Sequence, residues 1–217
     1  MSIIFNNIDK MSFDDISEES DFIPLMTNED EVALEKENLP DVLPILPLTN
    51  TVLFPGVVIP INAGRDKSIK LIKDANKSSK LIGVVAQRNI NDENPGIENI
   101  YGVGTVAKIL RVLKMPDGNT TVIIQGKKRF KIKSIVKSNP YIQATVDPVS
   151  DEVLKKSNSK FSATIDAIKD IALKIIKENP NIPSEASFAI KNIHSSAFLI
   201  NFVSSNMNIT VKDKQEL

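Results

Sequence analysis

The side chains that most often perform catalysis are scarce in this sequence. His194 is the only histidine, and there is no cysteine. One imidazole cannot build a metal site that needs two or more histidine ligands, and a Cys–His pair cannot form. Without cysteine there is no disulfide and no thiolate zinc site, which fits a reducing compartment. We therefore expect no metal site, and we place His194 at the surface between two helices.

Two serines lie three residues before a lysine, Ser134 before Lys137 and Ser157 before Lys160. A desolvated lysine can act as the base for a serine nucleophile. However, both pairs lie among other lysines, and neither serine has the flanking glycines of a nucleophile turn. Chance accounts for both in a chain rich in lysine and serine, so we expect no catalytic residue here.

The sequence contains no glycine-rich motif typical of a phosphate-binding loop. There is no G-x-x-x-x-G-K-[ST] motif, and Gly102-x-Gly104 precedes a strand-like segment rather than a helix. We expect no cofactor in this chain. A basic cluster could line a strand that binds nucleic acid, but the same alternation is typical of any half-buried strand, and aromatic residues for stacking make up 5% of the chain. We do not expect nucleic acid as a partner. The cluster consists of Lys127, Lys128, Arg129, Lys131 and Lys133.

The charge is divided unevenly, although the 217 residues have a net charge of zero. Residues 1–41 hold 12 acidic and 2 basic residues, whereas residues 42–217 hold 15 acidic and 25 basic ones. A strongly acidic segment with few apolar residues is typical of disorder, and we interpret residues 1–41 as a disordered tail. Alternatively, it is a peptide that docks on the basic remainder or on a partner through Phe22, Ile23, Leu25 and Met26.

No segment predicts secretion or membrane insertion. The first 20 residues lack an unbroken apolar core for a signal peptide. The longest apolar stretch, residues 52–61, contains two prolines and a glycine and is shorter than the roughly 20 residues that a membrane span needs. We expect a cytoplasmic protein with no membrane partner.

Residues 42–148 predict a β-rich part. Short apolar runs separated by Pro and Gly indicate strands at 43–48, 57–61, 81–87, 103–114, 121–126, 129–133 and 141–147, with one amphipathic helix at 64–77. Because Pro44, Pro47 and Pro60 cannot donate to a strand ladder, we expect them at strand starts, edges or bends. The connections are too short for a parallel βαβ sheet, which favours a small, mostly antiparallel barrel or folded sheet.

Residues 149–217 predict a bundle of helices, so the fold class is α+β. Apolar residues follow a helical period from Phe161 to Ile175, and a second helix starts near Glu185. Ser195 or Ser196 can cap a third, mostly apolar helix, and Thr210 with Asp213 resembles the start of a fourth. Because the chain ends inside that fourth helix, we expect it to be a fragment of a longer protein.

The combined motifs resemble the N-terminal domain of ATP-dependent Lon proteases. The matching strings are LPILPLTNTVLFPGVVIPI (43–61), GRDKSI (64–69), VAQR (85–88), YGVGTVAKILRVLKMPDG (101–118) and KENPNIPSE (177–185). The resemblance implies a PUA-like β-lobe followed by a helical lobe. It also implies that the domain binds unfolded or tagged protein substrates and supports assembly of a homohexamer. Met115 departs from the leucine common before PDG, and the acidic tail exceeds the family pattern.

The resemblance further implies an AAA+ ATPase, which would use ATP and magnesium, and a Ser-Lys protease domain. Neither lies in this chain, so whether to describe the protein as an enzyme depends on the parent. The alternative is a free-standing PUA-like module that binds RNA or a protein partner. A reading frame that continues past Leu217 into a phosphate-binding motif would distinguish the two.

Two turns are the predicted substrate contacts, because a domain that binds unfolded chains needs apolar side chains at its surface. Phe54 and Val57 flank Pro55-Gly56, where Gly56 can supply the positive φ of a type II turn. Met115 precedes Pro116 in the second turn, and its flexible thioether suits varied partners. The alternative is that Phe54 and Val57 are core residues at a strand bend.

Overall fold

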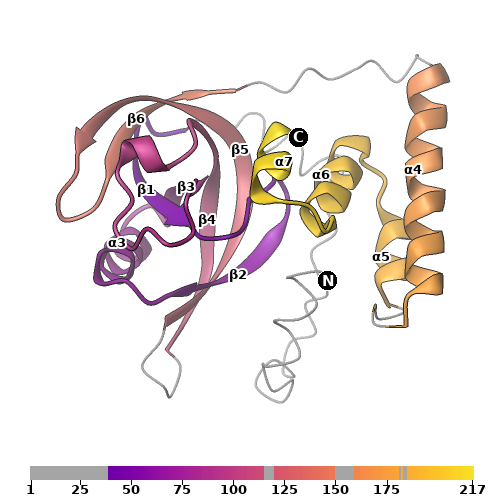
Figure 1. Cartoon of the computed structure of the whole chain (residues 1–217), viewed down its shortest axis with the longest axis horizontal. Coiled ribbons are helices and arrows are strands. Elements are labelled where there is room, and N and C mark those ends of the chain that lie inside the picture. Colours follow the sequence, from indigo (N-terminus) through magenta and orange to yellow (C-terminus); the bar gives the residue numbers. More distant parts are fainter. Residues whose placement is uncertain (1–38, 115–119, 150–158, 181, 183–184) are drawn as a thin grey trace.

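A computed structural model describes residues 39–114, 120–149, 159–180, 182 and 185–217 (Figure 1). Residues 1–38 of the predicted tail therefore lie outside the described residues. So do the turn that holds Met115 and the serine of the Ser157–Lys160 pair.

The described strands form one sheet that closes on itself. They are β1 (Val42–Leu48), β2 (Val58–Ala63), β3 (Leu81–Ala86), β4 (Val103–Lys114), β5 (Thr120–Lys137) and β6 (Gln143–Pro148). Their order is β2-β5-β4-β3-β1-β6, and an additional pairing of β5 with β6 completes a ring of five strands with β2 attached to β5. The β1–β3 pairing is parallel and the other pairings are antiparallel. This confirms a mostly antiparallel architecture.

β5 is one long strand, so the prediction of two separate strands at 121–126 and 129–133 was wrong. Its first half pairs with β2, and its second half pairs with β6. Gly126 does not interrupt it, because this residue pairs with Ala107 of β4. Irregularities in the register between Ile132 and Ser134 and between Ile135 and Lys137 let the strand bend, as β-bulges do, and so reach β6.

The prolines occupy the positions that their missing N–H groups allow. Pro60 lies in β2, whose only strand neighbour among the described residues is β5. Within β1, residues Val42–Pro44 pair with β6, whereas Ile45–Leu48 pair with β3. Each half of β1 therefore has one unpaired side. This confirms the expectation of locally exposed strand edges for these residues.

Five α-helices complete the described fold, together with a short 3-10 turn. Helix α3 (Asp66–Lys77) buries Leu71, Ile72 and Ala75. After β6 come α4 (Ser159–Glu178), α5 (Glu185–Asn192), α6 (Ser196–Asn206) and α7 (Val211–Glu216). The side chains of Ser195 and Thr210 cap α6 and α7, as their sequence positions predict. The connection between β3 and β4 contains the 3-10 turn, η2 (Ile97–Asn99).

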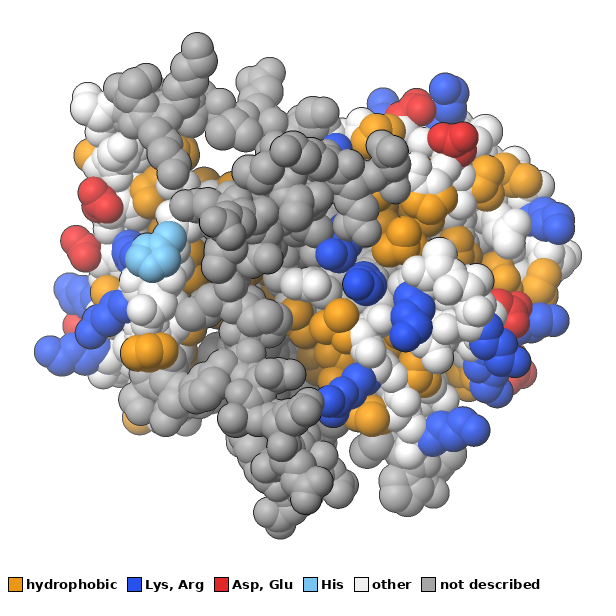
Figure 2. Space-filling model, turned by 180° about the vertical axis from the view of Figure 1, so that it is seen from behind, with side chains coloured by type: hydrophobic (Ala, Val, Ile, Leu, Met, Phe, Trp, Pro, Cys, Tyr) orange, Lys and Arg blue, Asp and Glu red, His pale blue; other side chains and the backbone are white. Residues whose placement is uncertain are grey.

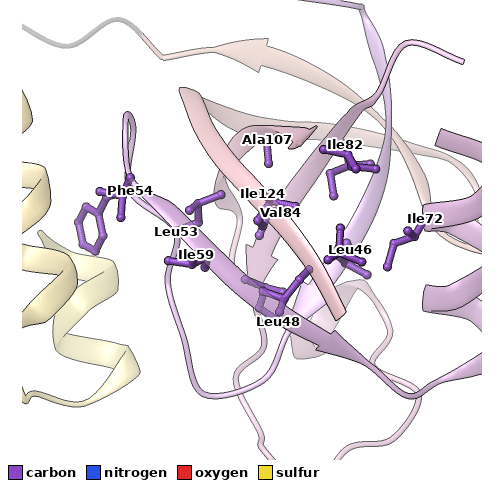
Figure 3. Packing of buried hydrophobic residues seen from close by; sticks show 14 of the residues in the cluster. Leu46, Leu48, Leu53, Phe54, Ile59, Ile72, Ile82, Val84, Ala107 and Ile124 are labelled. Carbon is purple, nitrogen blue, oxygen red and sulfur yellow. The ribbon is translucent and has the colours of Figure 1, made fainter. Parts of the chain in front are cut away.

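The β-rich part and the C-terminal helices share one hydrophobic cluster. Phe54 and Val57 belong to the same buried cluster as Phe198 and Phe202 of α6. Figure 3 shows the ring of Phe54 directed out of the strands towards the helices, away from the other labelled side chains. Helix α6 thus contributes to joining the two parts. By contrast, α4 stands at the far edge of the molecule (Figure 1), and none of its residues is buried.

None of the described helices is both long enough and apolar enough to cross a lipid bilayer.

Candidate functional site

The Phe54–Val57 segment forms the predicted tight turn. Gly56 has a φ of 78°, in the region that favours glycine, and the N–H of Val57 donates to the carbonyl of Phe54 at 3.2 Å. A proline at the preceding position presets the backbone for this turn. The type II prediction is therefore confirmed.

Two neighbouring strands hold this turn in place. The N–H of Gly56 donates to the carbonyl of Gly126 at 2.9 Å, and the N–H of Gly126 donates to the carbonyl of Val57 at 2.9 Å. A Cβ at position 126 would lie 2.2 Å from the carbonyl oxygen of Phe54, so only glycine fits there. From β4, Thr105 Oγ1 donates to the carbonyl of Leu53 at 2.6 Å. The turn is a rigid part of the β-rich lobe.

The structure buries both predicted contact residues in this turn. Phe54 is 3% exposed and Val57 is 2% exposed. This burial supports the alternative in which they are core residues at a strand bend. A substrate contact through them stays a prediction, and it would require the side chains to be uncovered. Met115, the third predicted contact, lies outside the described residues.

A groove of about 390 Å³ opens on another side of the β-rich lobe, next to α3. We call it the α3 groove. Its floor is β1 at Ile45–Pro47, one wall is α3, and the opposite wall is the chain between β5 and β6. Segment 93–98 forms the third side. The lining is mainly apolar at depth, where Ile45 and Leu71 are each 1% exposed. Charged residues of both signs stand among the lining residues: Arg65, Lys67, Glu93 and Glu98.

A polar network fixes the segment that walls the groove. Gln87, which is 3% exposed, donates through Nε2 to the carbonyl of Asp92 at 2.8 Å. Arg65 donates to Gln87 Oε1 at 3.1 Å and to the carbonyl of Asp92 at 3.1 Å. Asn99 Nδ2 donates to Asp92 Oδ2 at 2.6 Å. Since a buried amide needs partners for its polar atoms, Gln87 holds this wall against the strands.

Tyr141 ties the two long walls of the groove together. Its hydroxyl donates to Asp74 Oδ2 of α3 at 3.2 Å. Burial raises the pKa of Tyr141, and the hydrogen bond to Asp74 and the charge of that carboxylate raise it further. The phenol therefore remains protonated and able to donate at neutral pH.

Exposed apolar side chains gather on the first two C-terminal helices. Ile171 and Ile175, one turn apart on α4, are 60% and 54% exposed, and Phe188 of α5 is 64% exposed. Lys169 holds the two helices together, because its Nζ donates to the carbonyls of Lys191 and Ile193 at 3.1 Å each. These three side chains are available for apolar contacts.

The remaining candidates lie at the surface. His194 is exposed between α5 and α6, as predicted. Ser134 is exposed on β5, and its hydroxyl shares a hydrogen bond with Thr145 Oγ1. Lysine and arginine side chains are interspersed with apolar ones on the described surface of the β-rich lobe (Figure 2). Within the described residues, no group of three or more His, Asp or Glu side chains is placed to hold a metal ion.

Sequence reasoning missed the α3 groove. Its walls come from α3 and from the chain between β5 and β6, which lie about 70 residues apart, so no local pattern joins them. One signal was present. Pro47 has no N–H, and a proline inside a strand marks a place where a neighbouring strand is absent.

Comparison with known families identifies the chain. Residues 42–217 match the model of the ATP-dependent protease La (LON) substrate-binding domain. A Lon protease of Flavobacterium johnsoniae is 61% identical over 210 residues, covering 97% of this chain and 26% of that protein. A Lon protease of Cytophaga hutchinsonii is 52% identical over 201 residues, covering 93% of this chain and 25% of that protein. The chain thus spans about a quarter of these relatives.

A solved structure supports the same fold. The N-terminal domain of the Mycobacterium avium complex Lon protease aligns with a TM-score of 0.65 and 20% sequence identity, covering 81% of this chain and 88% of that one. The family match includes every strand and helix described above. This chain therefore belongs to the family of ATP-dependent protease La (LON) substrate-binding domains.

Proposed function

We propose that this chain binds unfolded or tagged polypeptides and delivers them to an ATP-dependent Lon protease. The observation that carries the proposal is the family match, which extends over residues 42–217 and thus over the whole described fold. The rigid barrel offers a scaffold, and the exposed apolar side chains offer contacts of low selectivity. Both properties suit a domain that must accept many different sequences.

The proposal includes a longer parent protein. In it, an AAA+ module would use ATP and magnesium, and a separate domain with a Ser-Lys dyad would cut the substrate. The parent would assemble as a homohexamer in the cytoplasm. This chain spans about a quarter of the length of these relatives, which supports a longer parent protein rather than a free-standing module that binds RNA or a protein partner. Several copies would then present their weak sites together and raise the avidity.

Two finer assignments belong to this proposal. We take the β-rich lobe to be PUA-like and the C-terminal helices to form a helical bundle lobe. We also retain Met115 as a contact for apolar side chains, together with Phe54 and Val57 if the latter two become uncovered.

The test is a binding titration with a permanently unfolded protein. Reduced, carboxymethylated lactalbumin is labelled with a fluorophore, and its anisotropy is followed as this chain is added. We expect a Kd in the micromolar range or weaker, because a small apolar surface must offset the ordering of a flexible chain. Native lactalbumin should not bind. Equal binding of both forms, or binding of neither, would contradict the proposal.

Surface variants locate the contact. Ile171→Ser and Phe188→Ser each remove an exposed apolar side chain. Each variant should keep the melting temperature of the unmutated chain and weaken binding by about threefold or more. Met115→Ser tests the third predicted contact in the same way. Ala163→Ser, which adds a hydroxyl at another exposed position of α4, is the matched control and should bind like the unmutated chain.

A further inference from the structure

The α3 groove lies where β6 leaves the side of β1. Strand β6 pairs with β1 at Val42–Pro44, and the N–H of Ile45 donates to the carbonyl of Ile142 at 2.8 Å. Beyond this bond, no described strand lies on that side of β1. On its other side, β1 is paired with β3 as far as Leu48. The groove thus runs along the open edge of Ile45–Leu48, whose other edge is paired with β3.

The backbone groups that face this open edge follow from the two-residue period of a strand. The N–H of Ile45 points towards Ile142, whereas the carbonyl of Leu48 points towards β3 and accepts from the N–H of Gln87 at 2.9 Å. Ile45 and Pro47 therefore direct their backbone groups into the groove. Because Pro47 has no N–H, it offers only its carbonyl oxygen, and its partner must be a hydrogen-bond donor.

The side chains around this edge favour an apolar, uncharged segment. Ile135, Ile142 and Leu71 line the groove on its two long walls. The charged residues that line it are two bases and two acids, so they give no net preference for a charged ligand. Its volume of about 390 Å³ is at the lower end of the range for ligand pockets and suits a few side chains.

We propose that a short extended segment of a polypeptide substrate binds in the α3 groove as an added β-strand beside Ile45–Pro47. One of its backbone N–H groups donates to the carbonyl of Pro47, and an apolar side chain enters the space between Leu71 and Ile142. Main-chain hydrogen bonds supply affinity that does not depend on sequence, and the pocket selects apolar residues. This inference rests on the proposed function and names where and how the chain engages its substrate.

The first test uses the blocked pentapeptide acetyl-Ser-Val-Leu-Val-Ser-amide and the ¹⁵N-labelled full chain. In an NMR titration we expect shift changes at Ile45, Leu46, Ser68 and Ile142. A second series carries a single N-methyl group at each peptide position in turn. Methylation of the amide that donates to Pro47 should weaken binding about tenfold, and methylation of the adjacent amides should have less effect. Equal binding of all the methylated peptides would overturn the strand-addition mode.

The second test fills the groove from its α3 wall. Ser68 is half-buried in the lining, so Ser68→Phe places a ring in the space that the peptide would occupy. Lys70→Phe puts the same ring on the exposed face of α3 and is the control. Both variants should keep the melting temperature of the unmutated chain. Ser68→Phe should weaken peptide binding more than about tenfold, whereas Lys70→Phe should not change it. A Ser68→Phe variant that is folded and binds equally well contradicts the site.

The outcomes separate this inference from the proposed function. If carboxymethylated lactalbumin binds the unmutated chain and the Ser68→Phe variant equally well, the groove assignment is wrong and the proposed function stands. If the peptide binds in the groove but the unfolded protein does not bind the chain, the groove stands and the proposed function is wrong. Peptide shifts that map to α4 and α5 alone would also overturn the groove.

Discussion

Arg129 of β5 donates a hydrogen bond to Asn201 Oδ1 of α6 at 2.9 Å, and this bond links the β-rich lobe to the C-terminal helices. Asn201 is 7% exposed, and the Arg129 guanidinium carbon lies 6.0 Å from the centre of the Phe54 ring. The surrounding contact is apolar and therefore not directional. A charged donor and a buried acceptor add direction, which fixes how α6 sits on the strands.

Breaking this link should destabilise the fold. Asn201→Ala removes the acceptor, and Arg129→Met leaves the Asn201 oxygen buried without this donor. Each should lower the free energy of unfolding by about 1–2 kcal/mol, with a coupling energy of about 1 kcal/mol in the double mutant. Urea denaturation measures all four proteins. Lys131→Met, at an exposed position on the same strand, is the control. Strictly additive effects would show that the hydrogen bond contributes nothing.

The close approach at Gly126 gives a sharper prediction. A methyl group there would meet the Phe54 carbonyl oxygen at 2.2 Å, and backbone atoms cannot move aside cheaply. Gly126→Ala should therefore cost more than about 2 kcal/mol, because the turn or β5 must shift. Gly102→Ala is the matched control, since no atom lies within 4 Å of the added Cβ, and it should change stability by less than about 0.5 kcal/mol. Similar unfolding midpoints for the two variants would refute the steric argument.

Local features were predictable from the sequence because their causes are local. The turn at Phe54–Val57 needs a proline followed by a residue that accepts positive φ, and both are adjacent in the chain. The caps at Ser195 and Thr210 depend on a side chain and an N–H three residues later. In each case the interaction partners lie within one turn of the chain, so residue type and spacing were sufficient.

Features formed by distant segments could not be read in this way. The pairing of β5 with β6 closes the barrel only because bulges bend β5, and bulge positions leave no simple sequence pattern. The exposure of Phe54 depends on α6, which begins more than 140 residues later. A large side chain beside a turn is equally consistent with a core residue and with a surface contact, and only the covering helix distinguishes them.

Removal of the acidic segment should leave the fold intact. Among the described residues, which begin at Leu39, both buried clusters consist of residues from Leu43 onwards, with Leu39 packed against one of them. A chain that begins at Asn38 keeps all of these side chains, and we expect its melting temperature to change by only a few degrees. Thermal unfolding followed by circular dichroism is the measurement. Loss of a cooperative transition would show instead that residues 1–37 stabilise the domain, as the docking alternative requires.

The last prediction concerns Lys214, which is 8% exposed and whose Nζ donates to the carbonyl of Ser205 at 2.6 Å, near the end of α6. Burial lowers the pKa of Lys214 from its ordinary value of 10.5. The unfolded chain therefore holds this proton more tightly than the folded chain does. Between the lowered pKa and 10.5, unfolding takes up a proton, so this site makes the fold more stable as the pH rises.

Lys214→Met removes this titration. The stability of the unmutated chain relative to the Lys214→Met variant should therefore increase as the pH approaches 10.5. At pH values below the lowered pKa of Lys214, this difference in stability should stay constant. Melting temperatures of both proteins between pH 7 and pH 10.5 provide the measurement. Lys212→Met removes an exposed lysine from the same helix and controls for the loss of one positive charge. If the curves of the unmutated chain and Lys214→Met run parallel across this range, burial at the end of α6 does not lower the pKa of Lys214.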